Sequence, residues 1–256
     1  MIPIFTFIIP SYNVFTAIGV LFVVVFLFFR MERFDINFGT LIFYLIIGTI
    51  GLLLGSRIMF VISCIPKLIN DFSISKLLYY IFNGGIVFYG GLIGVMAALK
   101  IGSKIKKHDT RKIFNYFTPS FPLFHMWGRI GCFFGGCCYG IPSGWGFPMA
   151  ADPDTTRIPV QLIESFCNLI IFIALINYEK RTKNENMNLL PIYLTSYAIC
   201  RFVLEFFRGD SARGLWGFFS TSQIISLIIL LCCIFLKIKE IMQPEKIENT
   251  ESENEI

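Results

Sequence analysis

The sequence has few charged residues and lacks the composition of a soluble domain. Only 15% of its 256 residues are Asp, Glu, Lys or Arg, whereas 55% are hydrophobic. Soluble domains carry about 25% charged residues, so a water-soluble globular fold is excluded. The formal net charge of +5 comes from basic residues in short loops, so we expect no nucleic-acid partner.

The sequence also lacks the features of a signal peptide and of a repeat protein. No basic segment precedes the first apolar stretch and no small-residue cleavage site follows it, so we expect no signal peptide. The sequence shows no internal repeat, and its one biased segment is the acidic end, EKIENTESENEI. We expect residues 240–256 to form an acidic, disordered cytoplasmic tail and residues 1–239 to form a membrane domain.

Long apolar stretches dominate the rest of the chain. A bilayer-spanning helix needs ~20 such residues. Interruptions by Pro119, Pro122, His125 and glycines make us expect irregular backbone at the end of the fourth stretch, covered by protein or lining a wet cavity. The sequence therefore predicts an all-α polytopic membrane protein with seven transmembrane helices, at about 12–30, 39–64, 84–101, 113–139, 159–178, 188–208 and 218–236.

The basic residues predict how the chain is oriented, because cytoplasmic loops carry an excess of Lys and Arg. The loop after the third stretch, KIGSKIKKHDTRK, contains six of them, and we expect its His108 to be merely solvated. The loops after the first and fifth stretches and the C-terminal end are also richer in Lys and Arg than the opposing loops. This pattern predicts an N-terminus outside the cell and a cytoplasmic C-terminus.

In that orientation, nearly all the ionisable groups within the spans fall in the outer half of the membrane. A charge in lipid costs ~2.5–3.5 kcal/mol or more, so such groups face the bundle interior and indicate function by default. Structural ion pairs need not gather at one depth, so the pattern favours a functional site. Its candidate polar residues are Tyr12, Arg57, Asn83, Tyr89, Arg129, Gln161, Glu164, Arg201, Glu205 and Arg208.

The candidate residues differ in how clearly they indicate a functional role. Arg201 and Glu205 have the i,i+4 spacing of a helix ion pair, which is compatible with both a structural and a catalytic role. Arg129 has no acid nearby in sequence, and its planar guanidinium suits the phosphate of a phospholipid headgroup. His125 is expected to be a hydrogen-bonded core residue. The pairs Gly84-Gly85 and Gly90-Gly91 permit close approach of a ligand or, as we favour, of a neighbouring helix.

Three cysteines, Cys132, Cys137 and Cys138, lie in the segment GRIGCFFGGCCYG and admit three interpretations. They lack the paired C-x2-C spacing of structural zinc, so no metal site is predicted. A disulfide is possible on the oxidising face, but C-x4-C-C is not a redox motif. The third interpretation is that the cysteines are small packing residues, in agreement with the apolar surroundings of Cys64, Cys167, Cys200, Cys232 and Cys233.

The same segment resembles the signature G-R-I-G-N-F-x-N-x-E-x-x-G of the bacterial prolipoprotein diacylglyceryl transferases. Five other segments resemble family motifs in the same order across roughly residues 12–235. They are SYNVFTAIG, GSRIMFV, NGGIVFYGGLIG, RIPVQLIES and YAICRFVLEFFRGD.

The resemblance implies an enzyme of the bacterial cytoplasmic (inner) membrane with an active site facing the outer leaflet. It implies transfer of the diacylglyceryl group of phosphatidylglycerol to the lipobox cysteine that follows a prolipoprotein signal peptide. A thioether forms, glycerol-1-phosphate leaves, and neither a cofactor nor a metal is required.

Site roles follow from the matched positions. Arg129 matches the family's lipid-binding arginine and Arg201 its second essential arginine. Tyr12, Tyr197, Glu205 and Gly140 match further important positions. The resulting catalytic candidates are Arg129, Arg201, Tyr89 and Glu205. The substrate-binding candidates are Arg129, Tyr12, Arg57, Asn83, Gly90, Gly91, Gly140, Gln161, Glu164, Tyr197 and Arg208, and the three cysteines have no assigned role.

Three replacements separate this chain from the family pattern. Tyr89 stands where the family has a histidine proposed as base, Cys132 replaces an asparagine and Cys137 replaces a glutamate. A tyrosine, with an ordinary pKa of ~10, is a poor base at neutral pH. The outer loop between Gly140 and Arg157 also leaves little room for an extra-membrane head. Two alternatives therefore stay open: a paralogue that delivers the lipid group to a glycan, a lipid or water, and a membrane thiol redox protein or transporter.

Overall fold

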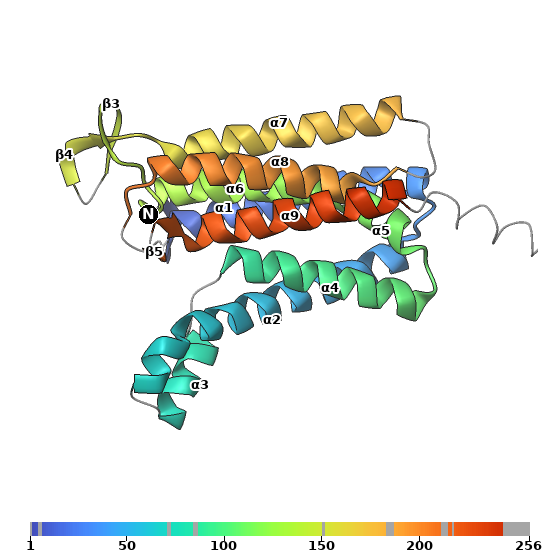
Figure 1. Ribbon diagram of the computed structural model, residues 1–256, viewed down its shortest axis with the longest axis horizontal. Helices are drawn as coiled ribbons and strands as arrows, with labels where there is room; N and C mark the ends of the chain where they lie inside the picture. The colour runs from blue at the N-terminus through green and yellow to red at the C-terminus, as the bar shows by residue number, and fades with distance from the viewer. Residues whose placement is uncertain are drawn as a thin grey trace, which may run out of the picture. The chain divides into compact units, whose positions relative to one another are not determined.

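The computed structural model describes residues 2–4, 7–70, 73–83, 87–149, 152–182, 187–210, 215–216 and 218–242, most of them in helices (Figure 1). The chain divides into two compact units. The first unit contains residues 1–24 and 118–256, and the second unit contains residues 25–117.

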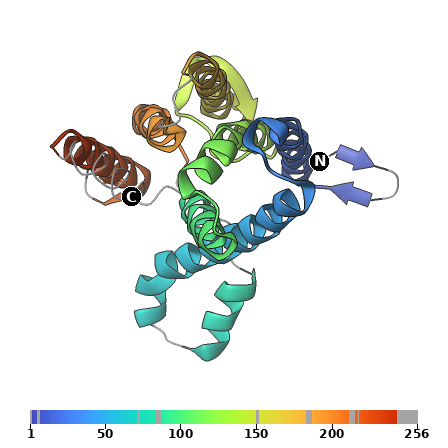
Figure 2. The same cartoon turned by 90° about the vertical axis from the view of Figure 1, so that its right-hand side faces the viewer.

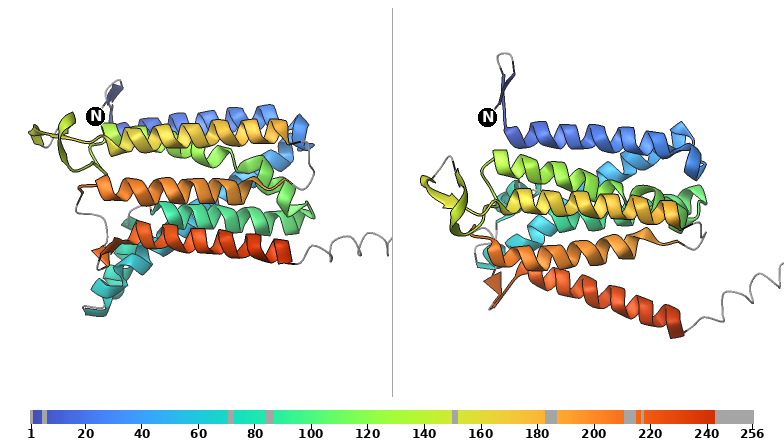
Figure 3. Two further views of the ribbon diagram at one scale, coloured as in Figure 1. Left: turned by 45° about the horizontal axis from the view of Figure 1, so that its top comes forward. Right: turned by 90° about the horizontal axis from the view of Figure 1, so that it is seen from above.

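The first unit is a bundle of helices. α7 packs against both α6 and α8, and α8 packs against α9. Figure 2 views α7, α8 and α9 close to end-on, and Figure 3 shows them side by side along their length. The 3-10 turn η2 (Glu205–Phe207) follows α8 directly. The unit comprises the start of α1 (Ser11–Arg30), α6 (Ser120–Phe134), α7 (Val160–Arg181), α8 (Leu189–Leu204) and α9 (Thr221–Met242).

Short antiparallel strand pairs also belong to the first unit, so the expectation of an all-α fold was wrong in this respect. The pairs are β1 (Ile2–Ile4) with β2 (Phe7–Ile9), β3 (Pro142–Met149) with β4 (Asp152–Arg157), and β5 (Leu215–Trp216) with β6 (Phe219–Ser220). The β3–β4 hairpin, which has an irregular register, occupies the loop that precedes α7 (Figure 1).

The second unit contains the end of α1 and the 3-10 turn η1 (Glu32–Phe34), followed by α2 (Phe38–Asn70), α3 (Ile74–Asn83), α4 (Phe88–Lys106) and α5 (Thr110–Phe117). The hydroxyl of Tyr44 lies 3.1 Å from Nδ1 of His108, so the expectation of a merely solvated histidine was wrong. The short helix α3 has no counterpart among the predicted spans.

Glycines bring α2 and α4 into direct contact. A β-carbon added at Gly55 would overlap the carbonyl oxygen of Gly90, and one added at Gly90 would overlap that of Gly55. Gly91 is less constrained, because its added β-carbon would meet Leu52 at 3.5 Å. Small residues allow such backbone approach between membrane helices. The helix-packing interpretation is therefore favoured for Gly90, while Gly84-Gly85 lies outside the described residues.

Substitution of Gly55 with alanine is expected to destabilise the fold by about 1–3 kcal/mol, because the methyl group must separate α2 from α4. Thermal unfolding of the detergent-solubilised protein measures the loss. Gly48→Ala is the matched control on the same helix, because a β-carbon there meets nothing within 4 Å. Equal unfolding temperatures for the two variants would contradict the packing role.

Six helices in the described part of the chain are long and apolar enough to cross a membrane. They are Ser11–Arg30, Phe38–Ile65, Phe88–Lys106, Val160–Arg181, Leu189–Phe207 and Thr221–Lys239. They correspond to every predicted span except the fourth, and they support a multi-pass membrane protein.

The fourth predicted span, 113–139, is divided into α5 and α6. The break falls beside Pro119, which lacks the backbone N–H that a continuous helix needs. α6 ends at Phe134, so the glycine-rich stretch after it is irregular, as expected. The total of seven spans and the orientation of the termini stay predictions. α9 runs to Met242, three residues past the predicted domain boundary at 239, and residues 243–256 of the predicted tail lie outside the described residues.

Candidate active site

The carboxylate of Glu164 on α7 lies at the centre of a buried polar network in the first unit. Its Oε1 lies 3.0 Å from Nη2 of Arg129 on α6 and accepts a hydrogen bond from the Tyr197 hydroxyl at 3.1 Å. Its Oε2 accepts a hydrogen bond from Nη1 of Arg201 on α8 at 3.3 Å. Nε2 of His125 lies 3.7 Å from Oε1. The Glu164 side chain is only 1% exposed, so these groups replace the water that would otherwise solvate its charge.

The network continues from α8 into the turn that follows it. Arg201 places Nη2 2.6 Å from Oε2 of Glu205, and the same Nη2 donates to the Ser222 hydroxyl at 3.1 Å. Nη1 of Arg208 lies 3.6 Å from Oε2 of Glu205. Arg208 donates from Nε and Nη2 to the two oxygens of Asp210, at 2.8 and 2.6 Å. We call this alternating series the charge chain: Arg129, Glu164, Arg201, Glu205, Arg208 and Asp210.

Helical spacing explains why these side chains meet. Tyr193, Tyr197 and Arg201 recur every four residues on α8 and are all buried. Gln161 and Glu164 are three residues apart on α7 and buried too. Residues three or four apart share one helical face. Each helix therefore turns a polar stripe toward its neighbours in the bundle.

The two arginines expected to bind lipid differ in how fully they are engaged. Both Nη atoms of Arg201 have partners, and its side chain is 3% exposed. Arg129 donates from Nε to Nε2 of His125 at 3.1 Å and pairs with Glu164 through Nη2. Its Nη1 has no hydrogen-bond partner within the described residues, and its side chain is 10% exposed. Arg129 therefore keeps a donor for an anion from outside.

The fold supplies partners for both Arg129 and His125. Arg129 has no acid nearby in sequence, but Glu164, 35 residues away in the chain, reaches it through the packing of α6 on α7. The expectation of a hydrogen-bonded core histidine is confirmed at His125.

Arg208 lies just beyond the last span-forming residue, Phe207. Burial by itself lowers the pKa of Arg208, but the hydrogen bonds to Asp210 and the nearby negative charges raise the pKa above its usual value. Asp210 was not among the residues predicted from the sequence. Its only sequence signal is an acid two residues after an arginine, in the segment FFRGD.

Backbone contacts join the turn after α8 to the end of the cysteine segment. Gly140 and Arg208 form an antiparallel bridge, and the amide of Gly209 donates to the carbonyl of Tyr139 at 3.0 Å. A β-carbon at Gly140 would overlap the carbonyl of Ile158 and lie 2.9 Å from Val160. Close backbone packing thus accounts for Gly140, which was predicted to contact substrate.

The end of α6 brings the three cysteines together. The amide of Cys137 donates to the carbonyl of Cys132 at 3.1 Å, and Nε2 of Gln161 donates to the carbonyl of Cys137 at 2.7 Å. Gln161 therefore holds the cysteine segment in place. Tyr12 lies against the same end of α6, with Cδ2 3.3 Å from the position of a β-carbon on Gly131.

The remaining predicted site residues belong to the second unit, so their place in the site stays a prediction. Tyr89 is buried on α4 with its ring 5.8 Å from that of Phe88. Arg57 lies on α2 and is half-buried. Asn83 ends α3, and its side chain lies outside the described residues, while Gly90 and Gly91 face α2 as described above.

Comparison with known proteins now decides the family. Residues 1–239 match the family model of prolipoprotein diacylglyceryl transferase. The chain belongs to this family. A relative from Clostridium tetani (strain Massachusetts / E88), named phosphatidylglycerol–prolipoprotein diacylglyceryl transferase, is 32% identical over 234 residues, covering 88% of this chain and 91% of the relative.

Other relatives within the diacylglyceryl transferases support the same assignment. Phosphatidylglycerol–prolipoprotein diacylglyceryl transferase 2 of Clostridium perfringens (strain 13 / Type A) is 31% identical over 197 residues, covering 75% of each chain. The transferase of Acinetobacter baumannii (strain ACICU) is 32% identical over 209 residues, covering 77% of this chain and 74% of its own.

The segments that resemble prolipoprotein diacylglyceryl transferase motifs are also the ones that meet in the charge chain. GRIGCFFGGCCYG supplies Arg129, RIPVQLIES supplies Glu164, and YAICRFVLEFFRGD supplies the other four members. This agreement between sequence motifs and buried ion pairs identifies the charge chain as the candidate active site.

Proposed function

We propose that this chain transfers the diacylglyceryl group of phosphatidylglycerol to the lipobox cysteine of prolipoproteins, in the bacterial cytoplasmic membrane. The observation that carries the proposal is the spare Nη1 donor of Arg129, in a buried network whose other two arginines are paired with carboxylates. Family membership and relatives named for this activity support it. They do not favour a different acceptor or a redox role.

Arg129 binds the phosphate of the donor lipid. A guanidinium forms strong, directional hydrogen bonds to phosphate oxygens. Glu164 and His125 hold the other two nitrogens of Arg129, so the position of Nη1 is fixed before the lipid arrives. Such preorganisation lowers the barrier, because no reorientation is needed as charge develops.

Transfer is a substitution at the glyceryl carbon that carries the phosphate ester. The acceptor sulfur, as thiolate, forms the C–S bond while the C–O bond to the phosphate breaks. The bonding electrons leave with glycerol-1-phosphate, and the thiol proton passes to solvent or to the released phosphate. Arg129 offsets the additional negative charge on the leaving group. No atom is oxidised or reduced, so the step needs no redox cofactor.

Arg201 has a positioning role in this scheme. It links Glu164 to Glu205 and has no free Nη atom for a phosphate among its described contacts. Both carboxylates contact a second arginine of the charge chain, so Arg201 acts on lipid through its neighbours. We also propose that the site opens toward the outer leaflet, as the distribution of basic loops predicts.

The test is expression of this chain in bacteria depleted of their own lipoprotein transferase. Mass spectrometry of a reporter prolipoprotein is expected to show addition of a diacylglyceryl group at the lipobox cysteine. A reporter with serine at that position is the matched control and is expected to stay unmodified. An unmodified cysteine reporter, with the protein inserted and folded, would refute the proposed activity.

A further inference from the structure

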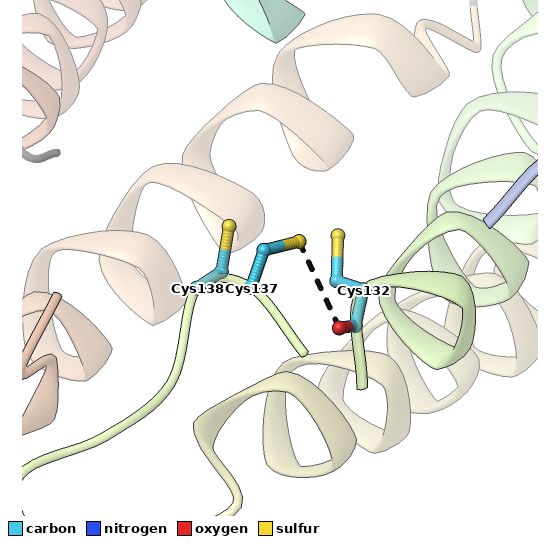
Figure 4. A group of neighbouring side chains, drawn as sticks. All are labelled: Cys132, Cys137 and Cys138. Carbon is cyan, nitrogen blue, oxygen red and sulfur yellow. Dashed lines mark hydrogen bonds between the residues drawn. The ribbon is translucent and has the colours of Figure 1, made fainter. Parts of the chain in front are cut away.

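Three thiols converge at the end of α6. The Sγ atoms of Cys132, Cys137 and Cys138 all lie within 4.8 Å of one another. Figure 4 shows the three side chains extending to the same side of the backbone, with Cys137 Sγ also 3.7 Å from the carbonyl of Cys132. All three cysteines are free, and Cys137 is exposed, so the cluster is accessible from outside the bundle.

The backbone is shaped to produce this convergence. Gly136 and Cys138 have φ values of 70° and 58°, both in the left-handed region. A non-glycine residue seldom adopts this conformation, and it persists only where the surroundings enforce it. The turn carries the chain back over the end of α6, so that Cys137 and Cys138 face Cys132. Packing residues in an apolar run would not need this arrangement.

The thiol positions fit a thiophilic metal ion. A Zn–S bond is ~2.3 Å, so sulfurs that share one tetrahedral zinc ion lie about 3.8 Å apart. Side-chain rotations that move the sulfurs by less than about 1 Å therefore close the site. Thiolates prefer zinc to calcium or magnesium. In the described residues, no fourth His, Cys, Asp or Glu joins the group. Structural zinc sites are closed by four protein ligands, whereas a three-ligand site leaves one position open.

The surrounding charge also suits this complex. A zinc ion with three thiolates has a net charge of −1. Arg129 lies three residues before Cys132 on α6, so the two residues share one face of that helix. A guanidinium on that face favours an anionic metal–thiolate complex over a bare cation. The cluster thus lies next to the arginine that is proposed to bind the donor lipid.

The acceptor thiol needs activation, and the first unit offers few bases for it. The only histidine in this unit is His125, whose Nε2 already accepts a hydrogen bond from Arg129. A thiol that binds to a metal ion loses its proton and keeps its nucleophilic sulfur. A zinc ion held by three thiolates favours another soft sulfur ligand at its open position.

We propose that Cys132, Cys137 and Cys138 bind one zinc ion as thiolates and that its open position takes the acceptor cysteine of the prolipoprotein. The three protein thiols release three protons when zinc binds, and the acceptor thiol releases a fourth to solvent. Zinc stays divalent throughout. When the acceptor sulfur forms its C–S bond, it leaves zinc as a neutral thioether. This role rests on the proposed transferase function.

Zinc binding itself is tested first with the full-length protein in detergent, reduced and stripped with a chelator. Competition with a chromogenic chelator is expected to show one tightly bound zinc ion per chain. Cys137→Ser removes a proposed ligand, so it is expected to weaken zinc binding by more than ~10²-fold. This loss exceeds the ~10–100-fold that is typical when a residue hydrogen-bonded to a ligand is replaced. Cys233→Ser on α9 is the matched control and should bind zinc normally. Absence of zinc binding, or equal binding by Cys137→Ser, overturns the proposal.

The open position is tested with cobalt in place of zinc. A peptide carrying a lipobox cysteine is expected to intensify the sulfur-to-cobalt charge-transfer absorption, whereas the serine peptide leaves the spectrum unchanged. An unchanged spectrum with both peptides overturns the acceptor role. Measuring prolipoprotein lipidation by zinc-loaded and by zinc-stripped protein distinguishes the proposed zinc role from the proposed transferase function. Full activity without zinc refutes the metal role alone, and zinc binding without lipidation in either state refutes the transferase function alone.

Discussion

Replacement of Arg129 with alanine is expected to lower the rate of diacylglyceryl transfer by about 10²–10³-fold, the usual cost of removing one preorganised donor to a developing charge. The variant loses the Nη1 donor and the positive charge beside the leaving phosphate. Its fold should persist, because Arg201 and Tyr197 still contact the buried Glu164 carboxylate. Initial rates of prolipoprotein lipidation in proteoliposomes containing phosphatidylglycerol measure the effect.

Two further variants make this result specific. Arg129→Lys keeps the charge but cannot reach His125, Glu164 and a phosphate at once, so we expect only partial recovery of the rate. Arg181→Ala removes an exposed arginine at the end of α7 and should leave the rate unchanged. A folded Arg129→Ala protein with the wild-type rate contradicts the phosphate role. Loss of function on cysteine replacement with Arg129→Ala tolerated is instead the pattern expected of a thiol redox protein.

Features that depend on one continuous segment were predictable from the sequence. The length of each apolar stretch is dictated by the bilayer, so six spans coincide with helices long enough to cross it. The ion pair between Arg201 and Glu205 follows from i,i+4 spacing on a single stretch. The division of the fourth span reflects Pro119, which the sequence had already indicated as an interruption.

Features that depend on how segments pack were not predictable in the same way. Arg129 finds Glu164 on another helix, and no local spacing reveals that pair. The β3–β4 hairpin escaped prediction because PSGWGFPM lacks the alternating apolar pattern of a half-buried strand. The cysteines follow no known ligand spacing, and only the left-handed turn at Gly136 and Cys138 brings their sulfurs together.

Glu164 is the residue whose loss should most affect the folded state. Glu164→Gln keeps the shape of the side chain and one acceptor for Tyr197, but it removes the charge that faces Arg129 and Arg201. Breaking a buried ion pair by removing one partner costs ~3–5 kcal/mol, because an uncompensated charge stays buried. We therefore expect a large fall in unfolding temperature together with loss of lipidation. Glu32→Gln, at an exposed acid, is the control and should unfold like the wild type.

A double-mutant cycle distinguishes charge pairing from a mere packing defect at Glu164. If the cost arises from unpaired guanidiniums, Arg129→Ala removes one of them and relieves part of the damage in the Glu164→Gln background. The double variant should then be more stable than the sum of the single effects by about 0.5–3 kcal/mol, the range measured for directly contacting groups. Strict additivity of the two substitutions would mean that the 3.0 Å contact between them contributes no coupling energy. In that case the charge chain does not hold Arg129 in place, and the phosphate site is fixed by the helix backbone alone.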